Sequence, residues 1–249
     1  MLAFLILEFL WPFAIVLVLC YVYIKCSAVN HFIRSGCKQN VLIVTAHPDD
    51  ECMFFAPTIL SLLQEGHQIY LVCLSKGNFY NQGELRKKEL LVSCGKLGIP
   101  QSNVTIIEDE RFQDGPENVW SIDGIVERVS GVIKRIGAKS VITFDGQGVS
   151  SHPNHVALFK AARRMVHEKV IEGVSVFVLE STNIVRKYVS IIDIPISSII
   201  CMTTFVSLPV DVYKAWLAMT AHKSQLVWFR KLYIFFSRYM YVNTLYKLD

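Results

Sequence analysis

The segment Val41-Leu42-Ile43-Val44-Thr45-Ala46-His47-Pro48-Asp49-Asp50-Glu51 decides the fold of this 249-residue chain. It joins an apolar run, typical of a buried strand, to a histidine, a proline and three carboxylates. In open α/β sheets, ligands bind beyond the carboxyl ends of the strands. A buried strand that ends in charged groups of this kind therefore indicates a catalytic site.

Short apolar runs and helical patterns alternate after this segment. Strands are predicted over 41–45, 69–74, 104–107, 140–144 and 174–179, and helices over 53–64, 84–97, 122–136 and 155–166. Apolar runs without alternation are typical of parallel strands that are buried on both faces, and intervening helices connect such strands. We therefore predict a Rossmann-like α/β domain over 41–249, with a mostly parallel sheet and helices on both faces.

The N-terminal region is apolar from residue 2 to residue 24 apart from Glu8. A helix of this length spans about 30 Å of hydrocarbon, so we predict one transmembrane helix, an anchor over 1–24, and a linker over 25–40. A cleaved signal peptide is disfavoured because no basic region precedes the run and no small-residue cleavage site follows it. Lys25, Arg34 and Lys38 follow the run, and the positive-inside rule then places the catalytic domain in the cytosol.

The cysteine content supports a cytosolic catalytic domain, and the net charge limits the possible binding partners. Seven cysteines, an odd number without a Cys-x-x-Cys pair, indicate free thiols in a reducing compartment. A net charge of +4 without a basic groove pattern does not predict a nucleic-acid partner.

Two later segments each allow two interpretations. The apolar stretch 189–209 contains Asp193 and Pro195, and a sheet edge with loops is favoured there over a second membrane segment. In 225–241, aromatic side chains alternate with Arg230, Lys231 and Arg238. This basic-aromatic C-terminal segment is typical of a helix in a membrane interface or of an amphipathic helix packed on the core.

A second polar cluster, Ser151-His152-Pro153-Asn154-His155, follows the predicted strand 140–144. The first and fourth strands of a doubly wound sheet are neighbours at the point where the strand order reverses, so the two clusters should face each other. His47, Asp50 and His155 then offer three N/O ligands to a metal, as in catalytic zinc sites. Such a metal lowers the pKa of a water molecule to about 7.

The remaining polar groups suit the roles that hydrolysis needs. Asp49 is the natural general base, His152 can stabilise an oxyanion, and Glu51 can orient a ligand. Taken separately, the first cluster can be a capped turn and the second a pair of surface histidines. Their joint occurrence at the ends of two predicted strands favours a functional site.

The pair of motifs Ala46-His47-Pro48-Asp49-Asp50-Glu51 and His152-Pro153-Asn154-His155 resembles the LmbE-like, or PIG-L, family of metal-dependent de-N-acetylases, over roughly residues 40–185. The resemblance implies deacetylation of an N-acetylglucosamine that is linked to another group. It implies a divalent metal, zinc first, held by His47, Asp50 and His155, with Asp49 as general base and His152 as electrophilic partner. Many bacterial relatives carry Asp where this chain has Asn154.

Further segments resemble the eukaryotic members of the family that act in GPI-anchor biosynthesis. These segments are the N-terminal apolar run, Gly77-Asn78-Phe79-Tyr80-Asn81-Gln82-Gly83-Glu84, Arg86-Lys87-Lys88-Glu89 and Trp228-Phe229-Arg230-Lys231-Leu232-Tyr233. The resemblance implies a membrane-embedded glycolipid substrate, N-acetylglucosaminyl-phosphatidylinositol, at the endoplasmic reticulum membrane.

Arg86 is predicted to bind the sugar or the phosphate of the substrate, since a guanidinium suits either. The alternative is an exposed helix charge paired with Glu84 or Glu89. Two other functions remain open: de-N-acetylation of a soluble N-acetylglucosamine conjugate, and a non-catalytic, membrane-bound lipid-binding or scaffold protein. The sequence predicts no particular protein partner.

Overall fold

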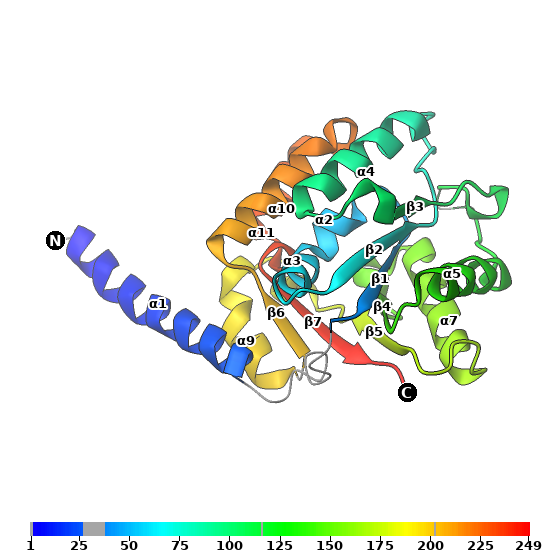
Figure 1. Ribbon diagram of the computed structural model, residues 1–249. Helices are drawn as coiled ribbons and strands as arrows, with labels where there is room; N and C mark the ends of the chain where they lie inside the picture. Colours follow the sequence, from blue (N-terminus) through cyan, green and yellow to red (C-terminus); the bar gives the residue numbers. More distant parts are fainter. Residues whose placement is uncertain (1, 27–37, 116, 202) are drawn as a thin grey trace.

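The computed structural model describes residues 2–26, 38–115, 117–201 and 203–249, and the side chains of 2–9 and 24–26 lie outside the described part. Its sheet has seven strands in the order β3-β2-β1-β4-β5-β7-β6 (Figure 1). The strands are β1 (Asn40–Thr45), β2 (Gln68–Cys73), β3 (Val104–Ile106), β4 (Ser140–Phe144), β5 (Ser175–Leu179), β6 (Thr203–Val206) and β7 (Val242–Lys247).

The helices alternate with these strands through the first part of the domain. They are α1 (Leu2–Cys26), α2 (Asp50–Phe54), α3 (Ala56–Gln64), α4 (Gly83–Leu97), α5 (Ile122–Ile136), α6 (Gly148–Ser151), α7 (Pro153–His167), α8 (Ile184–Lys187), α9 (Asp193–Ile200), α10 (Pro209–Ala221) and α11 (Trp228–Phe236). The short 3₁₀ helices are η1 (Gln101–Asn103), η2 (Glu110–Phe112), η3 (Ser190–Ile192), η4 (Lys223–Gln225) and η5 (Arg238–Met240).

The strand directions confirm the predicted α/β class and extend it. Strands β1 to β5 are parallel to one another, and β1 lies between β2 and β4. Strand β7 is antiparallel to both β5 and β6, so the complete sheet is mixed. A sheet edge was predicted within 189–209, where β6 lies, but no strand was predicted at β7.

Helices cover both faces of the sheet, as predicted. Helices α5 and α7 pack together on one face, while α3, α4 and α10 pack together with α2 on the other (Figure 1). Helix α5 shows why: Ile125, Val129 and Ile133 recur at helical spacing and are buried. Ser121 caps its N-terminus by accepting the Gly124 N–H, and Gly137 ends it in the left-handed conformation. Its range and that of β4 match the prediction to the residue.

One predicted helix differs from the observed structure. The pattern over 53–64 forms two helices, α2 and α3, which meet at Phe55, a residue outside the helical region (φ −114°, ψ 0°). Pro57 lies in the first turn of α3, where its missing N–H costs no hydrogen bond. Helix α2 therefore begins at Asp50, and Asp50 and Glu51 lie in its first turn.

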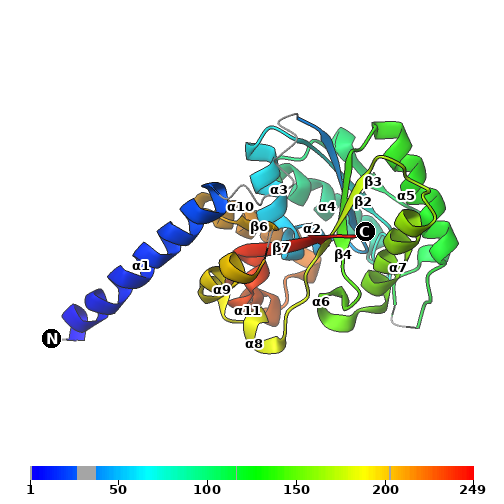
Figure 2. The same cartoon turned by 90° about the horizontal axis from the view of Figure 1, so that it is seen from below.

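The N-terminal segment is helical but does not support the predicted transmembrane anchor over 1–24. No helix in the described part of the chain has the length and the apolar character needed to cross a bilayer. Figure 2 shows α1 projecting away from the domain.

The base of α1 packs on the edge of the domain. Leu17, Cys20 and Tyr21 contact a small apolar cluster made by Ile194 of α9 and by Val206 and Val242 of the last two strands. Residues 27–37, most of the predicted linker 25–40, lie outside the described residues. The stretch 189–209 forms η3, α9 and the edge strand β6, which supports the favoured interpretation of a sheet edge.

The described cysteines are free, as the odd count predicted. Cys52, Cys73 and Cys94 are fully buried beneath the sheet and helices. Burial raises the pKa of each of these three thiols well above its usual value, so they act as small apolar side chains.

A buried group of charges joins α8, α9 and η5. The Asp193 carboxylate is 2.6 Å from Arg238 Nε and 2.7 Å from Arg186 Nε, and both Asp193 and Arg238 are fully buried. Ser197 Oγ donates to the same carboxylate at 2.7 Å. The segment after β5 is therefore fastened to the domain by paired charges as well as by apolar contacts.

Asp193→Asn should lower the free energy of unfolding by about 3–5 kcal/mol, because it leaves fully buried Arg238 without its counter-charge and removes the partner of Arg186. Glu127→Gln is the control, since it removes an exposed ion pair with Arg111 and should cost less than about 1 kcal/mol. Urea denaturation followed by circular dichroism measures both. Equal losses in the two variants would contradict the prediction.

Candidate metal centre and active site

The loop after β1 is built around the carboxylate of Asp50. Its Oδ2 accepts the backbone N–H groups of Ala46 and His47, each at 2.9 Å. Its Oδ1 lies 3.3 Å from His155 Nε2. Burial alone would raise the pKa of Asp50, but the charge of the neighbouring His155 outweighs it and holds that pKa well below its usual range. Asp50 is therefore an anionic group already oriented by the backbone.

The second cluster is placed by the loop from β4 into α7. Pro153 starts α7, and His155 lies in its first turn with its Nδ1 at 3.1 Å from the Gly148 carbonyl oxygen. The His155 ring stacks on Phe144 of β4, with the ring centroids 3.8 Å apart. Gly148 has φ +55°, and a Cβ there would lie 2.8 Å from the His155 Cβ. Glycine at this position lets the carbonyl approach the histidine.

The two clusters meet, as the predicted strand order required. β1 and β4 are neighbours, and ring nitrogens of His47, His152 and His155 lie within 4.8 Å of one another. Asp50 lies among them, with its Oδ2 3.9 Å from His47 Nδ1. The structure thus brings all five of the predicted metal and catalytic residues, Asp49 included, to one end of the sheet.

The hydrogen bonds distinguish the roles of the ring nitrogens. His47 Nε2 lies 3.2 Å from Asp114 Oδ1 and faces away from Asp50, and its other nitrogen, Nδ1, lies on the side of Asp50. His155 donates from Nδ1 to Gly148, and its buried Nε2 makes no hydrogen bond of its own. Metal-binding histidines commonly donate their second ring N–H to a carboxylate or carbonyl in this way. His47, Asp50 and His155 can therefore hold a divalent cation.

His152 has the opposite arrangement. Its Nδ1 accepts the backbone N–H of Asn154 at 3.3 Å and so caps α7, which leaves the ring proton on Nε2. Burial, together with the charges of His47 and His155, lowers the pKa of His152 to about 4. The ring is neutral at pH 7 and suits a hydrogen-bond donor. The Asn154 amide lies 2.9 Å from His47 Nε2, so Asn154 contacts a candidate ligand.

Asp49 lies beside this group in a left-handed backbone conformation (φ 112°). Its N–H donates to Glu51 Oε2 at 3.0 Å, and its carboxylate pairs with Arg230 and lies 3.7 Å from Arg86 Nη2. Glu51 was expected to orient a metal ligand. It is instead bound to His222 Nε2 at 2.7 Å and to Ser93 Oγ, and it holds Asp49.

Arg86 is a buried residue of this site. It donates to the carbonyl oxygens of Pro48 at 2.8 Å and Gly77 at 3.1 Å, and Nη1 lies 3.4 Å from Asp114 Oδ2. The alternative of an exposed helix charge paired with Glu84 or Glu89 is wrong. A Cβ at Gly77 would lie 2.5 Å from the guanidinium, so only glycine leaves room for it.

Sequence reasoning missed two members of the site. Asp114 joins His47 to Arg86 from a loop with no recognisable motif. Arg230 reaches Asp49 from α11, more than 180 residues along the chain. Arg230 was noted only as one charge of the basic-aromatic segment; the isolated arginine in an aromatic run was the available signal.

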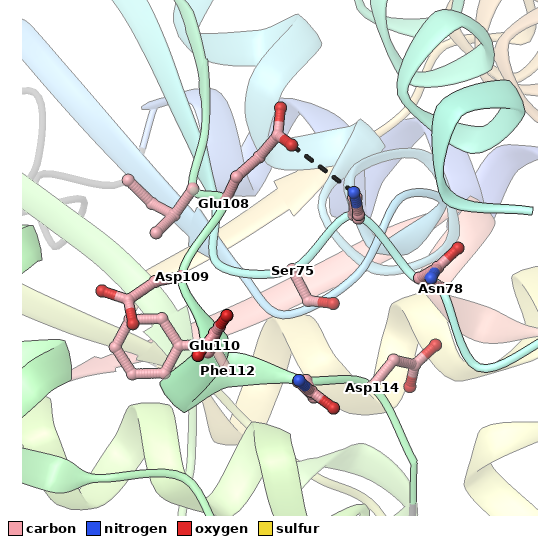
Figure 3. A pocket seen from close by; sticks show the side chains of 10 residues that line it. Ser75, Asn78, Glu108, Asp109, Glu110, Phe112 and Asp114 are labelled. Carbon is pink, nitrogen blue, oxygen red and sulfur yellow. Dashed lines mark hydrogen bonds and ion pairs between the residues drawn. The ribbon is translucent and has the colours of Figure 1, made fainter. Parts of the chain in front are cut away.

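These residues line a cavity of about 490 Å³. The polar lining residues are His47, Asp49, Asp50, Arg86, Asp114, His152, His155 and Arg230, and Phe54, Phe79 and Tyr80 add aromatic walls. Figure 3 shows a neighbouring cavity of about 410 Å³, with Glu108 and Asp114 on either side of Ser75. There the carboxylates are paired with cations, Glu108 with Lys76 and Lys87 and Asp109 with Arg111 and Arg128.

The comparisons with known proteins agree with this geometry. The family model PIG-L, described as GlcNAc-PI de-N-acetylase, matches residues 42–166. The chain is 50% identical over 212 residues to an N-acetylglucosaminyl-phosphatidylinositol de-N-acetylase of Bos taurus, covering 84% of each chain. It is 30% identical over 280 residues to the enzyme of that name from Saccharomyces cerevisiae, covering 92% of this chain and 91% of the relative. The chain therefore belongs to the PIG-L family of de-N-acetylases.

Solved structures share the fold at low sequence identity. N,N'-diacetylchitobiose deacetylase from Pyrococcus horikoshii matches with a TM-score of 0.64 at 16% identity, covering 90% of this chain and 88% of that one. The zinc-inhibited form of teicoplanin deacetylase Orf2 matches with a TM-score of 0.58 at 16% identity, covering 84% and 97%. Both confirm the α/β deacetylase fold.

His155→Ala and Asp50→Asn should each weaken Zn²⁺ binding by more than about 100-fold, because each removes a candidate ligand. His152→Ala should leave the affinity nearly unchanged, since the proton on Nε2 makes that ring a donor. His167→Ala is the matched control, an exposed histidine at the other end of α7. Isothermal titration calorimetry on folded protein measures the four affinities. An equal loss in His152→Ala and His155→Ala would assign the metal to the three histidines instead.

Proposed function

We propose that this chain hydrolyses N-acetylglucosaminyl-phosphatidylinositol to glucosaminyl-phosphatidylinositol and acetate, an early step of GPI-anchor biosynthesis. The observation that carries the proposal is the position of Asp49. It lies beside a group of ligands fit for a divalent cation, in a cavity that has room for a sugar. Relatives named for this reaction match the chain over most of its length.

We assign the metal site to His47, Asp50 and His155, with zinc as the first candidate. The orphaned Nε2 of buried His155, next to an ionised carboxylate, fits a cation that takes nitrogen and oxygen ligands. When bound, such an ion supplies Lewis acidity, which lowers the pKa of water and polarises the acetamide carbonyl.

The side chains around it would move the protons of the reaction. The Asp49 carboxylate takes a proton from the attacking water as its oxygen bonds to the acetamide carbon. Neutral His152 donates from Nε2 to the carbonyl oxygen as that oxygen gains negative charge. Asp49 then gives its proton to the sugar nitrogen as the C–N bond breaks, so that acetate and an amine leave. Arg86 and Arg230 hold the Asp49 carboxylate in place.

Arg86 remains our candidate for a substrate contact. It lines the cavity that contains the proposed metal ligands. A sugar hydroxyl or the substrate phosphate in that cavity would meet its guanidinium. The same guanidinium also orients Asp49, so a variant of Arg86 would change both substrate binding and turnover.

The purified full-length protein should release acetate from N-acetylglucosaminyl-phosphatidylinositol, a chelator should stop the release, and Zn²⁺ should restore it. Asp49→Asn should lower kcat by at least about 100-fold while Zn²⁺ still binds, because the base is lost but no ligand is. Equal activity on soluble N-acetylglucosaminyl-inositol would favour the soluble-conjugate function. Metal-loaded, folded protein without activity on either substrate would favour the non-catalytic lipid-binding or scaffold role.

We further propose that the protein works at the endoplasmic reticulum membrane, with its catalytic domain on the cytosolic side. Apolar side chains of α1 such as Trp11, Val18 and Leu19 are exposed to solvent, at 70%, 60% and 61%. Neighbouring α9 exposes Ile199 at 81%. A lipid surface is the partner that suits so many exposed apolar side chains along one edge of the molecule. The free, buried thiols fit a reducing compartment.

Replacing Val18 and Leu19 together by lysine should abolish co-flotation with phosphatidylcholine–phosphatidylinositol vesicles, because two charges would enter the bilayer at a cost of several kcal/mol. Val119→Lys is the control, as this valine is 95% exposed in a loop of the catalytic domain. Sucrose-gradient flotation of the full-length variants measures binding. Unchanged flotation of the double variant would show that α1 does not hold the protein on the membrane.

A further inference from the structure

A second cavity opens directly beside the candidate active site. It has a volume of about 630 Å³ and shares Met53, Phe54, Ser150 and Arg230 with the cavity that contains the candidate metal ligands. Its remaining lining comes from α8, from Tyr188 just after it, and from α11. The two cavities therefore adjoin, with these four residues on their common border.

The two cavities differ in chemistry. The first is lined by ionisable side chains, whereas the second is lined by the aromatic and aliphatic residues Tyr188, Trp228, Phe229, Leu232 and Phe236. Trp228 is 73% exposed and Phe229 54% exposed, although both belong to a helix that packs on the core through Tyr233 and Ile234. Apolar side chains at the mouth of a cavity favour an apolar ligand.

One cation is buried in the wall of this apolar space. Lys187, at the end of α8, is only 9% exposed, and its Nζ donates to the Val149 carbonyl oxygen at 3.3 Å. Within the described residues, no carboxylate lies within ion-pair distance of it, and burial lowers its pKa. Buried charges in proteins are usually paired, so this ammonium group lacks the anion that its burial requires.

We infer that the second cavity binds the phosphodiester and the adjoining acyl chains of the substrate, with Lys187 facing the phosphate and α11 facing the acyl carbons. The inference rests on the proposed function and adds to it the part of the substrate that each wall recognises. An anion attached to hydrocarbon satisfies both features of the cavity, the unpaired ammonium and the aromatic walls. A purely apolar ligand would leave Lys187 unpaired, and a soluble sugar would leave the aromatic walls in water.

The arrangement also matches the order of groups in the glycolipid. The acetamide to be cleaved lies at one end of the molecule, the inositol follows, and the phosphate and acyl chains lie at the other end. Arg230 stands at the boundary of the two cavities and already contacts Asp49. A substrate with its acetamide at the candidate metal ligands would then carry its phosphate past Arg230 toward Lys187.

The test is the binding of dihexanoyl-phosphatidylinositol, a soluble lipid that lacks the sugar, to the full-length protein by isothermal titration calorimetry. Lys187→Gln should weaken binding about tenfold or more, since glutamine keeps a donor but loses the charge. Phe229→Ser should weaken it about fivefold to tenfold through lost apolar contact. Phe235→Ser is the matched control, because Phe235 is on the same helix and 62% exposed but lines neither cavity.

A kinetic readout separates a binding role from a merely structural one. Lys187→Gln should lower the preference for N-acetylglucosaminyl-inositol phosphate over unphosphorylated N-acetylglucosaminyl-inositol about tenfold, as a ratio of kcat/KM values. An unchanged ratio would overturn the role of Lys187. Equal losses of lipid binding in Phe229→Ser and Phe235→Ser would overturn the acyl subsite and indicate a general membrane contact.

The outcomes also separate this inference from the proposed function. Wild-type protein that binds the short-chain lipid with the predicted pattern of variants, yet releases no acetate, would support the lipid subsite and contradict the deacetylase function. Wild-type protein that releases acetate from the soluble headgroup but does not bind the lipid would support the function and overturn the subsite.

Discussion

The active site depends on one buried hydrogen bond, from the N–H of Asp49 to the carboxylate of Glu51. A residue with a Cβ avoids the left-handed conformation that Asp49 adopts, at a cost of about 1–3 kcal/mol, unless its neighbours impose it. The conformation separates two adjacent carboxylates that would otherwise repel each other. Asp50 turns toward the histidines, while Asp49 turns toward Arg86 and Arg230. The backbone conformation of Asp49 thereby directs the proposed metal ligand and the proposed base to different partners.

The charge of Glu51 is neutralised from the other half of the chain. His222, which follows α10, places its Nε2 at 2.7 Å from Glu51, and both residues are fully buried. Burial alone would raise the pKa of Glu51 and lower that of His222, but their mutual attraction outweighs burial and shifts both pKa values the opposite way. Both shifts favour the charged form of each group. The C-terminal helices α10 and α11 complete a site that begins at β1.

The sequence was sufficient where local patterns decide the structure. The apolar run of β1, the amphipathic α5 and the position of both histidine clusters at strand ends predicted the doubly wound part of the sheet and the group around His47 and His155. Contacts made across long stretches of chain were not predictable in this way. Arg230 and Asp114 belong to no recognisable motif. The burial of Arg86 depends on the absence of a side chain at Gly77. Strand β7 depends on its pairing with β5, which its own six residues do not indicate. The apolar pattern of α1 correctly predicted a helix, but it did not establish that this helix crosses a membrane.

The position of β7 has a consequence for how the molecule is made. β7 follows β6 in the chain, yet it lies between β5 and β6 in the sheet. During synthesis, β6 therefore emerges from the ribosome before the strand that joins it to the rest of the sheet exists. The five parallel strands can assemble first, through contacts between neighbours in the chain. Three later steps need residues that follow β6. They are the pairing of β7 with its two neighbours, the packing of α1 against Val206 and Val242, and the contact between Arg230 and Asp49. The nascent chain thus contains the proposed metal ligands before the residues that complete the pocket have been made.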